Sequence, residues 1–201
     1  MGFLDRILGG SKRQTLKAEV PQMAYYRVLF GSDYSKRKGR YGIVRSLTPV
    51  NDHALKDGQP FPADLLTGLV FELEGDSYKV FADFQMCYMP WRMVSETVFN
   101  ILQPLSRPDL VEFHPIQIRS EHCGTGRHYI MHFPKTLDVI IEDEQFKTYG
   151  TMKARINVKA AECADVFLWN SFDPGPFIIS ERVKRAFEAA GLTGMTFQPV
   201  T

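Results

Sequence analysis

One pattern, which describes a capped helix leading into a short strand, occurs twice in this chain. Its clearer copy closes the sequence, at residues 177–199. Ser180 can accept a hydrogen bond from an N–H of the first helical turn, and Glu181 places negative charge where the helix dipole favours it. Gly191 follows the last apolar helical position, where a left-handed C-cap favours a residue without Cβ. The sequence therefore predicts a helix at about 181–190 and a strand at 195–197 that Pro199 ends.

The other copy begins at Ser95 and has the same parts in the same order. Its apolar positions predict a helix at about 95–104. Its strand has the same ending, a phenylalanine, one variable residue, a proline and an aliphatic residue. Because capping does not require that ending, we expect one helix-turn-strand unit to occur twice; the alternative is two unrelated units with ordinary caps. The motif residues are Ser95, Glu96, Phe113, Pro115, Ser180, Glu181, Gly191, Phe197 and Pro199.

Other segments have the length and apolar content of strands. They are residues 24–30, 69–74, 77–83, 127–133, 137–141 and 164–170. The second and third flank Gly75-Asp76, which predicts a β-hairpin. Many strands with two substantial helices predict an α+β fold with a mostly antiparallel sheet.

The domain organisation follows from these elements. Residues 1–22 are expected to form a short helix and a linker, since Phe3, Leu4, Ile7 and Leu8 make one small apolar face. That face is too small to anchor strongly in a membrane, so we expect it to dock on protein. Residues 23–90 would form a β-rich half and 91–201 a half with both units, or 23–201 would be one continuous domain.

The charge and cysteine content limit the partners and the compartment. The net charge is +1, which gives no reason to expect nucleic acid or a membrane as the main partner. The basic segment 35–40 lacks interleaved aromatic residues on which bases could stack, so we expect a solvated loop. No apolar run approaches the ~18 residues of a membrane span. Three widely spaced cysteines predict no disulfide framework and favour a reducing cytoplasm.

The segment 114–132 is the one place where reactive side chains gather. It contains His114, His122, Cys123, His128 and His132. On a strand, His128 and His132 would share a face but lie more than ~10 Å apart, too far for one metal ion. A reactive Cys123 with a histidine base would make the chain a small cytoplasmic enzyme. No phosphate-binding, nucleophile-elbow or metalloprotease motif occurs, so we expect a binding protein with no catalytic, metal or cofactor site.

Residues 90–200 resemble a family of bacterial immunity proteins that was first described in a myxobacterium. Genes of that family lie beside polymorphic and type VI secreted toxins. The resemblance covers 177–200, 94–118 with its Glu-Phe-His-Pro-Ile, the strands within 129–141, and Phe167-Leu-Trp169. It implies that the chain neutralises a cognate toxin protein by direct binding in the cytoplasm. The shared residues build the fold, so the resemblance identifies no toxin-binding residue.

An inhibitor of a basic toxin, such as a nuclease, would present an acidic surface to it. The best acidic cluster in this sequence consists of Asp138, Glu142, Asp143 and Glu144. If the toxin is basic, this cluster is the candidate contact for it; otherwise these residues are an ordinary solvated turn.

Overall fold

The computed structural model describes residues 24–30, 42–51, 54–74, 80–142, 155–169 and 176–200. Five features predicted from the sequence lie outside these ranges. They are the N-terminal helix with its linker, the basic segment 35–40, the turn at Gly75-Asp76, Asp143 and Glu144.

The described residues form strands and helices in an α+β arrangement, which confirms the predicted class. The strands are β1 (Tyr25–Phe30), β2 (Ile43–Ser46), β3 (Phe71–Glu74), β4 (Phe84–Gln85), β5 (Arg92–Ser95), β6 (Glu112–Ser120), β7 (Gly124–His132), β8 (Ile140–Ile141), β9 (Arg155–Ile156), β10 (Val166–Phe167), β11 (Ile178–Ser180) and β12 (Met195–Val200). The helices are α1 (Glu96–Leu102), α3 (Val158–Ala161) and α4 (Glu181–Ala189). Among these residues, no helix is long and apolar enough to cross a membrane.

The larger sheet curls until its two outer strands meet. Its order is β2-β3-β6-β7-β5-β4, and only β3 and β6 run parallel among its named strands. The chain that follows β4 returns to β2, where the N–H of Val44 donates to the Met86 carbonyl at 2.8 Å and the N–H of Tyr88 donates to the Val44 carbonyl at 3.0 Å. The closed interior is filled by apolar side chains such as Phe71, Met93 and Ile130.

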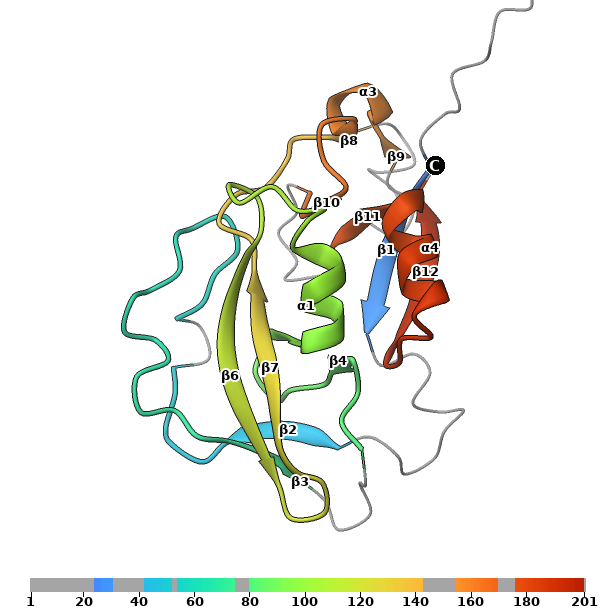
Figure 1. Cartoon of the computed structure of the whole chain (residues 1–201). Helices are drawn as coiled ribbons and strands as arrows, with labels where there is room; N and C mark the ends of the chain where they lie inside the picture. The colour runs from blue at the N-terminus through green and yellow to red at the C-terminus, as the bar shows by residue number, and fades with distance from the viewer. Residues whose placement is uncertain are drawn as a thin grey trace, which may run out of the picture.

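The smaller sheet repeats part of the larger one. Its order is β10-β11-β1-β12, and four strands of the larger sheet lie in the matching order β4-β5-β7-β6, all antiparallel. In each set a helix joins the second strand to the fourth: α1 between β5 and β6, and α4 between β11 and β12. Each helix packs on the second and third strands of its own set, and the helices contact each other. Figure 1 shows α1 between the long β6–β7 hairpin and the smaller sheet.

The registers of the two sets agree residue by residue. Tyr129 of β7 pairs with the residue before the cap serine on one side and with Pro115 on the other. Tyr26 of β1 pairs with the residue before the other cap serine and with Pro199. The helix-turn-strand unit predicted twice from the sequence is therefore one structural unit present twice. The third strand of each set differs in its place in the chain. In the first copy it is β7, which follows the unit, and in the second it is β1, which precedes the unit. The two copies are therefore related as in a circular permutation.

Each unit begins at the same hydrogen-bonded corner. Ser95 Oγ accepts from the N–H three residues on at 3.3 Å and donates to Asp83 Oδ1 at 2.8 Å. Ser180 Oγ accepts from the corresponding N–H at 3.4 Å and donates to Asp165 Oδ1 at 2.6 Å. Each aspartate lies directly before the outer strand of its set, so the cap of the helix also fixes that strand.

Asp83 also joins the first unit to the second. Its Oδ2 accepts from both the N–H and the hydroxyl of Thr193, each at 2.9 Å, in the turn that follows α4. The N–H of Phe84 donates to the Thr193 carbonyl at 3.1 Å beside this contact. One carboxylate therefore ties the start of one helix to the end of the other.

The C-terminus of α4 has the predicted left-handed cap. Gly191 has a φ of 64°. Its N–H donates to the Glu188 carbonyl at 3.1 Å, and the N–H of Leu192 donates to the Phe187 carbonyl at 3.3 Å, which is the Schellman pattern.

One predicted strand boundary is wrong. Pro199 does not end its strand, because β12 continues through Val200. β12 is the outer strand of its sheet, where the missing N–H of a proline can face away from the paired strand. The hairpin predicted around Gly75-Asp76 falls mostly outside the described residues; within them, β3 pairs with β2 and β6, and residues 80–83 form no strand.

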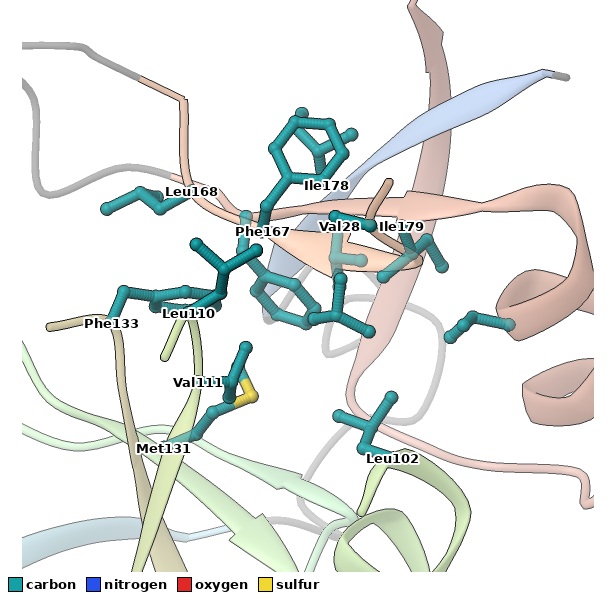
Figure 2. Close-up of a cluster of buried hydrophobic side chains, with 14 of the residues drawn as sticks. Val28, Leu102, Leu110, Val111, Met131, Phe133, Phe167, Leu168, Ile178 and Ile179 are labelled. Carbon is teal, nitrogen blue, oxygen red and sulfur yellow. The ribbon is translucent and has the colours of Figure 1, made fainter. Parts of the chain in front are cut away.

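Both sheets bury side chains in one shared core. Val28 and Ile179 of the smaller sheet and Met131 of the larger one belong to the same buried cluster, which Figure 2 shows between the two sheets. Since β1 pairs with β11 and β12, the boundary considered at residue 90 separates strands that share a sheet.

We predict that Gly194→Ala destabilises the protein more than Gly191→Ala. Both glycines have positive φ, 85° and 64°, so each alanine should cost about 1–2 kcal/mol in backbone strain. A Cβ at Gly194 would also lie 2.5 Å from the Phe84 carbonyl oxygen, whereas a Cβ at Gly191 meets nothing within 4 Å. Urea unfolding of both variants measures the difference, and equal losses would contradict the close approach of Gly194 to β4.

We also predict that Asp83→Ala costs about 3 kcal/mol of unfolding free energy, because it removes three hydrogen bonds to a charged acceptor. The matched control is Asp109→Ala, which removes only a solvent-exposed ion pair with Arg107 and should cost far less. Chemical denaturation of both variants tests this, and similar losses would show that Asp83 does not join the units.

Candidate functional site

The structure describes half of the predicted acidic cluster. Asp138 and Glu142 are exposed, on either side of the buried Val139 and close to β8. They lie on the surface of the protein, as a contact for a basic partner would require. Asp143 and Glu144 lie outside the described residues, so the cluster as a whole has no described geometry.

The histidines and Cys123 of the 114–132 segment are spread along a hairpin, with His128 midway along β7. β6 and β7 pair from Glu112 opposite His132 to Ser120 opposite Gly124. His122 and Cys123 lie in the turn beyond that last pair. At about 3.3 Å per residue, the turn is roughly 25 Å from the end that carries His132. The hairpin therefore keeps Cys123 away from that histidine.

His132 and His114 hold a loop on the sheet. The ring of Phe61 stacks on His114 with centroids 3.5 Å apart and meets His132 edge to face at 5.6 Å. His132 Nε2 donates to the Gln59 carbonyl at 2.7 Å. The same loop is held by an ion pair of 2.9 Å between Asp57 and the buried Arg92. These contacts give both histidines a packing role.

His128 is buried between the sheet and Phe81, whose ring it contacts edge to face at 5.1 Å. Burial lowers the pKa of His128 from its ordinary value of 6.5, although the nearby backbone and Asp83 act in the opposite direction. Burial also lowers the pKa of His114, with Glu112 opposing. Both imidazoles are therefore neutral at pH 7. Among the described residues, no group of three or more His, Cys, Asp or Glu side chains could hold a metal ion.

A pocket of about 340 Å³ opens where the two sheets meet. It lies between the end of β1 and the segment that joins β4 to β5, and its volume falls in the range of ligand sites. The apolar part of its lining consists of Val28, Leu29, Met86, Met89, Pro90, Trp91 and Pro176.

The polar groups of this pocket differ in whether they are satisfied. Gln85 Oε1 accepts from the N–H of Ala82 at 3.0 Å, and its Nε2 donates to the Gly42 carbonyl. The guanidinium of Arg92 is paired with Asp57 at 2.9 Å and lies over the Phe133 ring. The indole N–H of Trp91 is buried and has no hydrogen-bond acceptor among the described residues.

Large apolar side chains are exposed beside the pocket. Tyr88 is 65% exposed and Met86, which lines the pocket, is 36% exposed. Their backbone is held on β2 by the hydrogen bonds to Val44, so this segment presents its side chains from a fixed position. Tyrosine and methionine are enriched in protein–protein interfaces.

Sequence reasoning did not select this segment as a site. Its signal was present as a short run of methionines and aromatic residues, from Met86 to Trp91, before the first unit. Such a run is also typical of a buried core, and only the fold shows which members are exposed.

No protein-family model matches the chain, and no curated protein matches it.

We predict that the protein loses stability as the pH falls below about 6.5. Because the pKa of His128 is lowered in the folded state, the unfolded chain binds more protons below its own pKa. The stability from a neutral His128 is therefore complete above the unfolded pKa and is lost as the pH falls through and below it. His128→Leu should lose less stability than the wild type between pH 7.5 and 5.5, while exposed His122→Ala should follow the wild type. Urea midpoints at both pH values provide the measurement, and identical losses in all three proteins would contradict it.

Proposed function

We propose that this chain is an immunity protein that neutralises a cognate secreted bacterial toxin by direct protein–protein binding in the cytoplasm. The toxin would belong to a polymorphic or type VI secretion system, as the resemblance of residues 90–200 implies. The observation that carries the proposal is the exposed Tyr88 and Met86 on a fixed backbone beside the pocket.

The physical argument concerns what an exposed tyrosine on a rigid segment can do. Energetically dominant interface residues are few, and they are enriched in tyrosine, tryptophan and arginine. Burying Tyr88 against a partner would remove a large apolar area from water. Because hydrogen bonds to Val44 already hold the backbone, binding would order little chain and lose little conformational entropy.

The acidic surface at Asp138 and Glu142 is the second candidate contact. It suits a basic toxin, and charge of this kind acts mainly on the rate of association and on specificity. The alternative is an enzyme that uses the 114–132 segment, and against it stands the register of the hairpin, which holds Cys123 and His132 far apart.

The test uses the secreted toxin that this proposal expects to be encoded beside the gene. We predict that the purified full chain forms a stoichiometric complex with it and protects cells that express it. His122→Ala and Cys123→Ala should leave complex and protection unchanged. Absence of a complex, or an enzymatic activity of the chain alone that these changes abolish, would overturn the proposal.

The two candidate surfaces are separated by comparing variants in the same binding assay. Tyr88→Ala should weaken the complex by tenfold or more, as expected for a hot spot. Leu47→Ala, a matched control at a 48% exposed apolar position, should change the affinity by about twofold or less. A larger loss in Asp138→Asn with Glu142→Gln than in Tyr88→Ala would assign the contact to the acidic surface.

A further inference from the structure

The Phe-x-Pro ending of the two units is not required by their helices or caps. Its phenylalanine holds the strand to the helix in both copies. The ring of Phe197 lies 6.4 Å from that of Phe187 of α4, and the ring of Phe113 lies 5.3 Å from that of Phe99 of α1, between centroids. The proline follows two residues later, and its ring is exposed in both copies. An exposed ring adds little to the core, so the two prolines act through the backbone.

The register of the smaller sheet fixes the direction of the Pro199 nitrogen. On one side of β1, the N–H of Val28 donates to the Phe177 carbonyl at 2.9 Å. Alternate residues of a strand bond to opposite neighbours, so Tyr26 also bonds toward β11, and Arg27 bonds toward β12. Pro199 is the partner of Tyr26 in β12. Its nitrogen therefore points away from β1, to the outer edge of the sheet.

This outer edge is open to another strand, because none of the described strands pairs with it. The backbone N–H and C=O groups of Met195 and Phe197 point toward it, since they alternate with the groups that bond to β1. Open edges tend to pair with another chain, and natural proteins prevent this with charged residues or proline. The sequence of β12, MTFQPV, contains no charged residue. Pro199 is therefore the residue of this strand that can prevent pairing.

The first unit shows what happens beside the equivalent proline. There β3 runs parallel to β6 and pairs with Ile118 and Arg119. Closer to Pro115 the two segments separate, and a pocket of about 280 Å³ opens between Pro115 and the residues before β3, such as Leu69. A strand can therefore lie beside this edge, but its ladder stops before it reaches the proline.

We propose that Pro199 prevents β12 from pairing with the β12 strand of a second copy of this chain. An antiparallel pair of these strands centred on Phe197 would place Met195 of each copy opposite Pro199 of the other. The Met195 N–H would donate to the Pro199 carbonyl, but Pro199 has no N–H to return, and its ring would meet the opposing strand. A centre closer to the start of β12 would involve Thr193, which is bound to Asp83. The inference concerns the chain alone and does not depend on the toxin.

The substitution Pro199→Val tests the inference, because it returns an N–H to the outer edge and keeps an apolar side chain. One hydrogen bond regained per copy should strengthen self-association by about tenfold or more over the wild type. Sedimentation velocity over a hundredfold range of protein concentration measures this. Pro108→Val is the matched control, because Pro108 is exposed and lies outside the strands, and it should sediment as the wild type does. A Pro199→Val protein that also sediments like the wild type overturns the inference.

Amide hydrogen exchange followed by NMR locates the contact. In the wild type, the N–H groups of Thr196 and Gln198 face β1 and should exchange slowly, whereas that of Phe197 faces outward and should exchange rapidly. In the associated Pro199→Val protein, exchange at Phe197 should slow by about tenfold or more. Slow exchange of Phe197 in the wild type overturns the inference, because the edge would then already be covered; this measurement does not depend on whether a variant folds. Association of Pro199→Val with unchanged exchange at Phe197 overturns it as well, because the contact would lie elsewhere.

Discussion

The carboxylate of Asp83 is the contact on which the arrangement of the two units depends. One of its oxygens accepts from the serine that caps α1, and the other accepts twice from Thr193 in the turn after α4. Hydrogen bonds to a charged acceptor are among the stronger ones in proteins. The equivalent residue of the second unit, Asp165, binds its own cap serine and Arg182 instead. The two corners therefore differ in the second partner of the aspartate: Asp83 binds the other unit, whereas Asp165 binds within its own.

The two units have also diverged in how they cover the tyrosine at their centre. In the first, Phe99 of α1 stacks on Tyr129 with ring centroids 4.0 Å apart. The same helical position in the second is Lys184, whose ammonium lies 5.0 Å from the centroid of the Tyr26 ring. A stacked aromatic pair has been replaced by a cation–π contact on the same geometry. Among the described residues, strands β2 and β3 extend the sheet of the first unit, and with them it forms the closed interior against which residues 86–91 lie.

This divergence places the pocket at the junction between the repeated parts. Val28 and Leu29 come from the smaller sheet, while Met86 and Trp91 come from the chain that closes the larger one. Neither unit would form these walls alone. The histidines that seemed chemically informative in the sequence support the packing of Phe61 and Phe81 instead. The candidate contact surface is therefore the apolar one formed by Met86 and Tyr88 beside the pocket, not the hairpin.

The sequence by itself determined the features that depend on neighbours a few residues away. The serine caps, the left-handed Gly191 and the two helices involve bonds between residues up to five positions apart, so their signals are contiguous in the chain. The repeated helix-turn-strand unit could be recognised in the sequence for the same reason, because its signals are contiguous in the chain.

The pairings between distant segments were decided only by the tertiary structure. The strands that pair with β3 could not be assigned from residues 69–83. Its described partners are β2 and β6, and both lie outside that segment of the sequence. The separation of Cys123 from His132 became visible only with the register of the hairpin. The candidate site also required contacts between distant segments, since Leu29, Trp91 and Arg92 line one pocket only when both sheets are in place. A run of apolar residues has the same pattern whether it is buried or exposed, and only packing against the rest of the chain distinguishes the two.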